Sequence, residues 1–152
     1  MKNTIGIRRE DLDKRGERRV AIIPDEVQNF SAKGFRFMVQ PGIHPESQED
    51  KSAFEDETYK NSGATISHSL EDADVIFGLK EVKAAQLLPE KAYLFFSHTH
   101  KGQTKNRPLL QTMVDKKITL IDYELMIDAD RRRLLTAFTY IAGNAGIIDS
   151  LW

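Results

Sequence analysis

Residues 75–79 read VIFGL, a continuous apolar run. Two further runs, nearly continuous, are YLFF at 93–96 and ITLI at 118–121. Short runs of this type are typical of parallel strands covered on both faces, whereas a strand with one wet face alternates polar and apolar side chains. The three runs therefore predict the centre of a parallel sheet.

Shorter strand-like and helix-like segments surround this centre. Pro24 fits the first turn of a helix that carries apolar Val27, Phe30 and Ala32, and Gly34 supplies a stop signal. The other expected strands are 5–7, 35–39 and 64–66, and the other expected helices are 50–61, 108–114 and 137–152. This alternation predicts the α/β class, here a Rossmann-like, mostly parallel sheet with helices on both faces.

The composition is that of an ordinary globular chain of one domain. Of the 152 residues 40% are hydrophobic, and 22 basic against 23 acidic residues leave a net charge of -1. This balance gives no sign of a nucleic-acid or membrane partner. No apolar run approaches the roughly 18 residues that a membrane helix needs. Because residues 1–7 show no signal or transit pattern, a bacterial, cytoplasmic protein is the default expectation.

Cysteine is absent, which excludes disulfides, thiolate catalysis and cysteine-ligated metals. The four histidines show no helical metal-binding spacing. His98 and His100 could pair on a strand, but no third ligand is evident, so we predict no metal site.

No GxGxxG segment follows an expected strand. GNAG at 143–146 is only GxxG without a tight strand-to-helix turn before it, so no dinucleotide site of the usual kind is encoded. The chain stops at Trp152 within a helical pattern, without Gly, Pro or a polar tail. We therefore expect a chain truncated before a further domain.

Ionisable groups follow four of the expected strands. In an open parallel sheet the carboxyl ends of the strands share one edge, where ligands bind. A single such group is more often a solvated loop charge, but four sets together predict a site at this edge. They are RRE at 8–10, KE at 80–81, SHTHK at 97–101 and DYE at 122–124.

Lys80 and His98 are the main candidates for proton transfer, because each comes at the end of an apolar strand run. A lysine that leaves a dry strand can lose solvation, which eases deprotonation near neutral pH, and histidine titrates there unaided. The alternatives are a lysine that extends into water and a histidine that only caps its loop. Position alone leaves both open.

Two arginine clusters are candidates for binding carboxylates. Arg18 and Arg19 precede VAIIP at 20–24, and a basic triplet at 131–133 precedes Leu134. The planar guanidinium matches a carboxylate with two hydrogen bonds. A basic triplet is usually a solvated turn, yet two clusters in a chain of near-zero net charge are compatible with a substrate that has several carboxylates.

Several segments, in order, carry a resemblance to a known family. They are IGIRRED at 5–11, ERR at 17–19 with Pro24, FFSHT at 95–99 with Lys101 and Gln103, LIDYE at 120–124, and Arg133 with AF at 137–138 and AG at 142–143 and 145–146. They are similar to the amino-terminal domain of the lysine–2-oxoglutarate reductase and saccharopine dehydrogenase (lysine-forming) family, within the alanine dehydrogenase/transhydrogenase superfamily. The resemblance runs from about residue 4 to about residue 148.

This resemblance implies that the chain binds lysine, 2-oxoglutarate and saccharopine. In that family the ε-amine of lysine couples with the ketone of 2-oxoglutarate, and a nicotinamide hydride reduces the imine to saccharopine, or the reverse occurs. It also implies a substrate-binding domain at 1–138 and, at 139–152, the start of a long helix that leads to a missing NAD(P)-binding domain. NADP or NAD would be bound mainly by that missing domain. A homo-oligomer is compatible with the family.

The resemblance further implies roles for single residues. Lys80 and His98 match the acid–base pair, and Arg19 matches the arginine that holds a substrate carboxylate. Positions that would bind substrate or tune the pair are Arg18, Glu81, Lys101, Glu124, Arg132 and Arg133. The acidic Glu81 after Lys80 is similar to the lysine-forming dehydrogenases and departs from the reductase domains.

Two other functions remain open on the sequence. An alanine dehydrogenase would use Arg19, Lys80 and His98 on pyruvate and ammonia, although the arginines at 131–133 favour a larger, dicarboxylic substrate. A stand-alone, non-catalytic module that binds amino acids or a partner is the other. A gene that ends at codon 152 would favour the module, and an open frame that continues into a GxGxxG segment would favour an enzyme.

Overall fold

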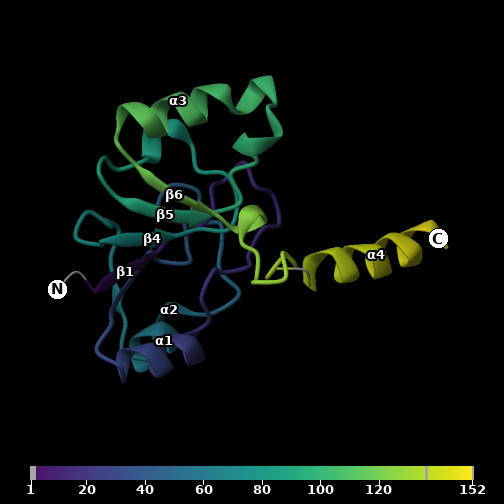
Figure 1. The fold of residues 1–152 in the computed structure, drawn as a ribbon. Helices are drawn as coiled ribbons and strands as arrows, with labels where there is room; N and C mark the ends of the chain where they lie inside the picture. Colours follow the sequence, from purple (N-terminus) through teal and green to yellow (C-terminus); the bar gives the residue numbers. More distant parts are fainter. Residues whose placement is uncertain (1–2, 136, 152) are drawn as a thin grey trace.

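The computed structural model describes residues 3–135 and 137–151. Its centre is a six-stranded, all-parallel sheet in the order β3-β2-β1-β4-β5-β6 (Figure 1). The strands are β1 (Thr4–Ile7), β2 (Arg36–Val39), β3 (Thr65–Ile66), β4 (Val75–Phe77), β5 (Ala92–Phe95) and β6 (Thr119–Asp122). The α/β class and the parallel sheet predicted from the sequence are confirmed.

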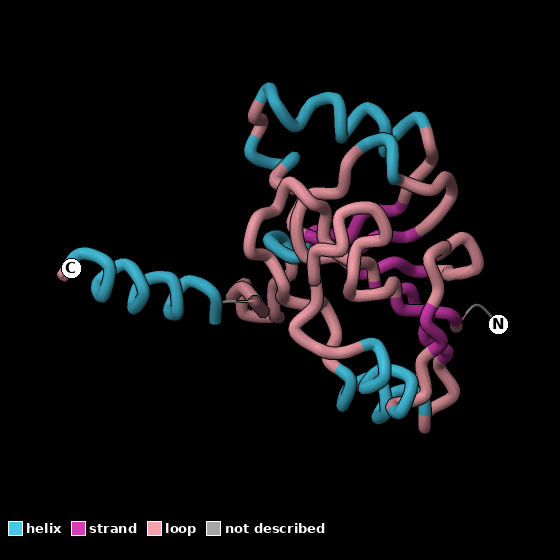
Figure 2. Tube along the Cα trace, turned by 180° about the vertical axis from the view of Figure 1, so that it is seen from behind, coloured by secondary structure: helices cyan, strands magenta, loops and turns pink. Residues whose placement is uncertain are grey.

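Helices lie on both faces of this sheet. They are α1 (Pro24–Ser31), α2 (Asp56–Asn61) and α3 (Arg107–Asp115), whereas α4 (Ala137–Ser150) extends away from the sheet. Short 3-10 helices η1 (Ala84–Gln86), η2 (Thr99–Lys101), η3 (Thr104–Asn106) and η4 (Tyr123–Leu125) lie in the loops. Figure 1 and the view from behind in Figure 2 place α3 on one side of the strands and α1 and α2 on the other.

The chain signals that begin and end α1 act as expected. Pro24 occupies the first turn, where its missing N–H costs no hydrogen bond and its fixed φ suits the helix. Gly34 follows the helix with a φ of +91°, a conformation that only glycine adopts without strain. The chain can therefore reverse directly into β2.

Each layer of helices buries its own hydrophobic cluster. Beneath α3, Ile76 of β4 and Tyr93 and Phe95 of β5 form one cluster with Leu109 and Met113 of the helix. On the other face, the cluster beneath α1 and α2 consists of Ile7, Val27, Phe37, Val39, Tyr59 and Ala64. In β2, Phe37 and Val39 enter the core beneath α1 and α2, while Met38 between them packs against the core beneath α3, which fixes the register of this strand.

The helix expected at 50–61 begins only at Asp56, so the first half of that prediction is wrong. Side chains in this segment hydrogen-bond to nearby backbone instead. Asp50 Oδ1 accepts the N–H of Ser52 at 3.0 Å, and Ser52 Oγ accepts the N–H of Phe54 at 3.1 Å. Such local bonds offer the backbone an alternative to the helix, which is why Asp and Ser favour turns.

The strand order reverses direction between β1 and β4, because β1 connects through α1 to β2 while β4 connects to β5 on the opposite side. The carboxyl ends of these two strands form the topological switch point, where open α/β sheets bind their ligands. Helix α4 extends from this same edge (Figure 1). Within residues 3–135 and 137–151 we find no helix with the length and apolar character of a membrane span.

Candidate active site

A cavity of about 480 Å³ lies at the carboxyl edge of β4, β5 and β6. This volume falls within the roughly 300–1,000 Å³ of ordinary small-molecule sites. Charged side chains and apolar side chains share its wall, so it can hold a ligand with charged ends and a carbon chain. The lining residues are Arg19, Leu79, Lys80, Phe96, His98, Glu124, Arg133, Leu135, Ile141, Ala142 and Ala145.

His98 is held at the end of β5 in an unusual backbone conformation. Its φ of 53° lies in the left-handed region, which a residue with a Cβ adopts only when the surroundings enforce it. The buried Asn106 donates from Nδ2 to the carbonyl of His98 at 3.2 Å. Ser97, the preceding residue, is fully buried and donates its backbone N–H and its hydroxyl to Asp122. These contacts fix the direction in which the imidazole leaves the sheet.

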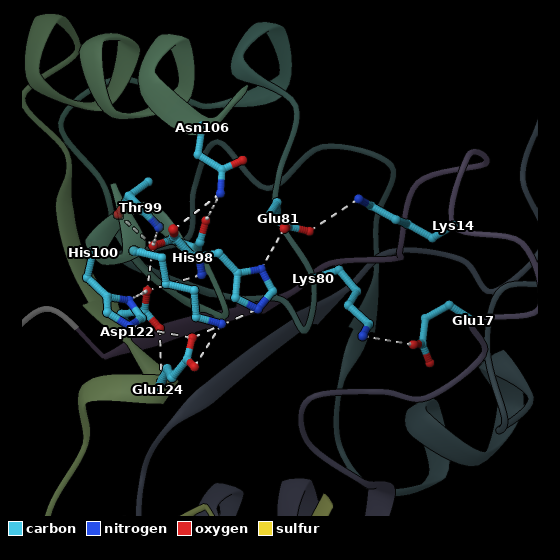
Figure 3. Close-up of polar contacts among 12 residues, drawn as sticks. Lys14, Glu17, Lys80, Glu81, His98, Thr99, His100, Asn106, Asp122 and Glu124 are labelled. Carbon is cyan, nitrogen blue, oxygen red and sulfur yellow. Dashed lines mark hydrogen bonds and ion pairs between the residues drawn. The ribbon is translucent and has the colours of Figure 1, made fainter. Parts of the chain in front are cut away.

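The imidazole of His98 is paired on one side with Glu81. His98 Nδ1 lies 2.6 Å from Glu81 Oε1, and Lys14 Nζ lies 3.3 Å from the other oxygen of the same carboxylate (Figure 3). Burial of Glu81 opposes its ionisation, but the hydrogen bonds from His98, the backbone and Lys14 outweigh burial and hold its pKa at about 2. An ionised Glu81 orients the ring and stabilises a positive charge on it.

On the other side of His98, the carboxylate of Glu124 lies close to several basic side chains. Lys101 Nζ lies 2.9 Å from Glu124 Oε1, and Arg133 Nη1 lies 3.9 Å from the same atom. The Nε2 atoms of His98 and His100 lie 3.9 and 3.8 Å from Glu124 Oε2. Figure 3 shows this carboxylate between the histidines, below the β5 loop. Glu124 thus links His98 to Lys101 of the same loop and to Arg133 of a later segment.

Lys80 and Arg19 meet at Glu17, which is 10% exposed. Arg19 donates from Nε and Nη2 to the two oxygens of Glu17, at 2.8 and 2.5 Å, and Lys80 Nζ lies 3.9 Å from Glu17 Oε2. The hydrogen bond from Arg19 lowers the pKa of Glu17 and raises that of Arg19. The loop that carries Arg19 is thereby brought against the end of β4.

The backbone of Lys80 is held by a buried carboxylate from the β1 loop. Glu10 accepts the N–H groups of Leu79 at 2.8 Å and of Lys80 at 3.1 Å. Burial raises the pKa of Glu10, and these hydrogen bonds together with Arg8 oppose that shift. β4 ends at Phe77, and beyond it the N–H groups of Leu79 and Lys80 bond to Glu10 while the carbonyl of Leu79 still accepts the N–H of Phe96 at 3.0 Å. The apolar run at 75–79 is therefore two residues longer than the strand.

The structure brings together most, but not all, of the residues singled out from the sequence. Arg19, Lys80, His98, Glu124 and Arg133 line one cavity. Glu81 and Lys101 touch His98 and Glu124 from outside the lining.

Two arginines lie elsewhere. Arg18 binds Asp50 and the carbonyl of Ser52, and Arg132 is exposed beside Asp130 at 3.5 Å. Neither lines the cavity. Within the described ranges no group of three or more His, Asp or Glu side chains is arranged to hold a metal ion.

Sequence reasoning missed several residues of the site. Lys14 and Glu17 belong to a charged loop, 8–19, in which spacing gives no hint of the partner of each side chain. Ile141, Ala142 and Ala145 of α4 add small and apolar side chains to the wall. Small residues in a helix were the one available signal for them, and that signal equally fits helix packing.

The described residues do not form a dinucleotide cradle. Gly143 and Gly146 lie inside α4, and a Cβ at either would meet no atom within 4 Å, so neither marks a close approach of backbone to phosphate. Gly78 does follow a strand, but the side chain of Arg8 fills the space beside it, 2.9 Å from where a Cβ would lie. No glycine-rich turn leads into a helix amino terminus there.

The chain is similar in sequence to several known enzymes and in structure to a solved transhydrogenase. The alpha-aminoadipic semialdehyde synthase of Arabidopsis thaliana is 38% identical over 153 residues, which cover 97% of this chain and 14% of that protein. The saccharopine dehydrogenase [NAD(+), L-lysine-forming] of Candida glabrata is 30% identical over 136 residues, covering 86% of this chain and 34% of that protein. A solved transhydrogenase structure from Sinorhizobium meliloti has a TM-score of 0.77 at 21% identity, covering 97% of this chain and 43% of its own.

These relatives are all much longer, since the chain spans only 14% to 15% of the length of the first four curated relatives. The sequence pattern described as "Alanine dehydrogenase/PNT, N-terminal domain" matches residues 6–145. The resemblance inferred from the sequence is thereby confirmed. This chain belongs to the alanine dehydrogenase/PNT N-terminal domain family.

Proposed function

We propose that this chain is the substrate-binding and acid–base part of an oxidoreductase that interconverts lysine plus 2-oxoglutarate with saccharopine. The observation that supports this most is the cavity in which Arg19, Lys80 and His98 converge from three separate segments. The similarity to a lysine-forming saccharopine dehydrogenase points in the same direction. A substrate with carboxylates at its ends and a carbon chain between them suits a wall of this composition.

The arginines of the wall act on the carboxylates of the substrate. Arg19 has a planar guanidinium that Glu17 holds in place through two hydrogen bonds, and a substrate carboxylate would compete with Glu17 for this fork. Arg133 lines the same cavity and is 62% exposed, so it can reach a second carboxylate. Apolar Leu79, Phe96 and Leu135 would contact the carbon chain between them.

Lys80 and His98 move protons while the carbon–nitrogen bond forms. The lysine ε-nitrogen, once deprotonated, adds to the ketone carbon, and the carbonyl oxygen takes a proton to give a carbinolamine. Loss of water then requires a proton on the departing hydroxyl and removal of one from nitrogen. Since Glu81 occupies His98 Nδ1, Nε2 is the ring atom left to exchange protons.

Reduction of the imine needs a hydride, which NAD(P)H supplies in enzymes of this type. We assign no part of the hydride transfer to this chain. We propose that the cofactor is bound mainly by residues beyond it. Cytoplasmic location, the boundary at residue 138 and a homo-oligomer stay predictions from the sequence.

Alanine dehydrogenase activity is the main alternative. Pyruvate has one carboxylate and needs one arginine, whereas Arg133 joins Arg19 in the wall of this cavity, which favours a dicarboxylic substrate. The non-catalytic module would use the same arginines to bind an amino acid but would have no need of the arrangement of Glu81 about His98.

A steady-state assay of the complete enzyme that contains this chain tests the proposal. It would be run with lysine, 2-oxoglutarate and NADPH or NADH, and then with pyruvate and ammonium. Turnover with the first set is the expected result. Turnover with the second set alone would establish the alanine dehydrogenase alternative and exclude the saccharopine reaction.

A further inference from the structure

A second cavity, of about 490 Å³, lies at the same edge of the sheet and shares no lining residue with the first. Its wall takes Arg8 and Arg9 after β1, Gln40 after β2 and His68 after β3. Residues of β4, of β5 and of the loop after β4 complete its wall, so it lies over the switch point between β1 and β4, whereas the active-site cavity lies at the ends of β4 to β6. Nothing in the proposed reaction uses it.

Two acidic residues of this wall, Asp11 and Glu10, already contact Arg8. Arg8 Nη2 donates to Asp11 Oδ1 at 2.6 Å, and Arg8 Nη1 lies 3.6 Å from Glu10 Oε1. Glu10 is further occupied by the backbone N–H groups that follow β4. These contacts neutralise Arg8 and occupy Glu10 and one oxygen of Asp11, whereas Asp11 Oδ2 is buried and has no hydrogen-bond partner among the described residues.

Arg9 is the cation of this wall whose guanidinium binds backbone carbonyls, while the carboxylates of Asp11 and Asp56 attract its charge without a salt bridge among the described residues. Its Nη1 donates to the carbonyl oxygens of Pro41 at 2.8 Å and Ile43 at 3.4 Å, and in the described part of the chain it makes no salt bridge. Burial and the neighbouring Arg8 lower the pKa of Arg9, so its surroundings disfavour its charge. Its Nε and Nη2 groups remain to bind an anion, which would relieve that cost.

The same wall contains two further hydrogen-bond donors, His44 and Lys83, and one exposed carboxylate, Glu46. His44 Nδ1 accepts the backbone N–H of Glu46 at 3.2 Å, which places the proton of the neutral ring on Nε2 as a donor. Lys83 also lines the cavity, and its pair with Asp13, at 3.4 Å between half-exposed side chains, is weak. The exposed carboxylate of Glu46 works against an anion in the same wall.

Apolar side chains also line this cavity, among them Leu70, Ile76, Leu88 and the ring of Tyr93, beside polar Ser69 and Gln86. An inorganic anion would leave this surface unused, whereas a carbon chain would cover it. We propose that the second cavity binds a small organic carboxylate, with its carboxylate on Arg9 and its carbon chain against Leu70, Ile76 and Leu88.

The four histidines allow ligand binding in each cavity to be followed separately by NMR. His44 and His68 lie in the second cavity, whereas His98 lines the first and His100 lies beside it. The 152-residue chain would be titrated with glutarate at constant pH and ionic strength while the imidazole signals are followed. Pentane-1,5-diol supplies the same carbon chain without charge, and inorganic phosphate supplies charge without carbon.

Saturable shifts of His44 and His68 with glutarate, stronger than with phosphate and absent with the diol, are the expected result. Shifts confined to His98 and His100 would support the active-site cavity and overturn this second site. Shifts confined to His44 and His68 would support the second site and count against binding of a dicarboxylate in the active-site cavity. Equal responses to glutarate and the diol, or tighter binding of phosphate, would overturn the assigned ligand class.

Two substitutions sharpen the test. Glu46→Gln removes the opposing charge from an exposed loop without touching its backbone bond to His44, and should tighten glutarate binding about two- to fivefold. Arg9→Gln should weaken it about tenfold or more, and Arg9→Lys should weaken it less because the charge remains. An unchanged dissociation constant in Glu46→Gln would overturn the proposal even if the Arg9 variants fail to fold.

Discussion

The Nδ1 atom of His98 lies 2.6 Å from Oε1 of Glu81, and this contact decides which side of the imidazole is available to a ligand. The left-handed backbone at His98 and its hydrogen bond from Asn106 hold the ring in this orientation. A histidine that only capped its own loop would not need a carboxylate from the neighbouring strand end. The geometry therefore favours a role in proton transfer.

The low pKa of Glu81 predicts a loss of stability in acid. A carboxylate whose pKa falls from 4.5 to about 2 on folding stabilises the protein fully above pH 4.5, and this contribution disappears as the pH falls toward 2. The difference in unfolding free energy between the natural chain and Glu81→Gln should therefore shrink between about pH 5 and pH 2. Urea denaturation at a series of pH values measures it, and a difference that is constant over this range would contradict the assignment.

Removal of either member of the acid–base pair should lower turnover without abolishing the fold. Lys80→Met and His98→Gln in the complete enzyme should each reduce kcat by roughly 10²–10⁴-fold, the range expected for lost proton transfer. Lys60→Met is a matched control, because Lys60 is exposed on α2 and its one salt bridge among the described residues is with Glu57. Unchanged steady-state rates in both variants would remove these residues from the mechanism.

Arg19→Lys should chiefly weaken substrate binding. A lysine cannot reproduce the two-pronged contact that a guanidinium makes with a carboxylate, so KM for 2-oxoglutarate should rise more than kcat falls. Arg36→Lys, at the exposed start of β2, is the control for the same chemical change. A KM equal to that of the natural enzyme would show that Arg19 does not hold the substrate.

Phe95→Ala should destabilise the fold by about 3–5 kcal/mol, as expected for a fully buried aromatic side chain. Phe95 is 0% exposed in the core beneath α3, where its ring meets that of Tyr93 edge to face at 6.2 Å. Val114→Ala removes apolar atoms from the exposed side of α3 and should change stability by less than about 1 kcal/mol. Equal midpoints for the two variants in urea denaturation would show that the core has been misplaced.

The sequence was sufficient to predict the architecture because the strongest local patterns agree with the tertiary fold. The apolar runs at 75–79, 93–96 and 118–121 became three adjacent parallel strands, and Pro24 and Gly34 mark the limits of α1. Element ends were less predictable. The helix expected from residue 50 begins at Asp56 because side-chain bonds from Asp50 and Ser52 compete with it.

The site was predictable only in part, because some of its residues come from strand ends and others from an irregular loop. Strand order brings Lys80, His98 and Glu124 to one edge, and that follows from the alternation of strands and helices. The partners from the 8–19 loop do not follow, because an irregular loop has no periodicity from which to place Glu17. Arg18 and Arg19 are adjacent in sequence, yet only Arg19 reaches the cavity, which depends on the local path of the backbone.

A crystal structure of the chain with saccharopine bound tests the central claim most directly. The account predicts a saccharopine carboxylate within hydrogen-bonding distance of the Arg19 guanidinium and the secondary amine beside Lys80 and His98. Saccharopine bound away from these three side chains would contradict it.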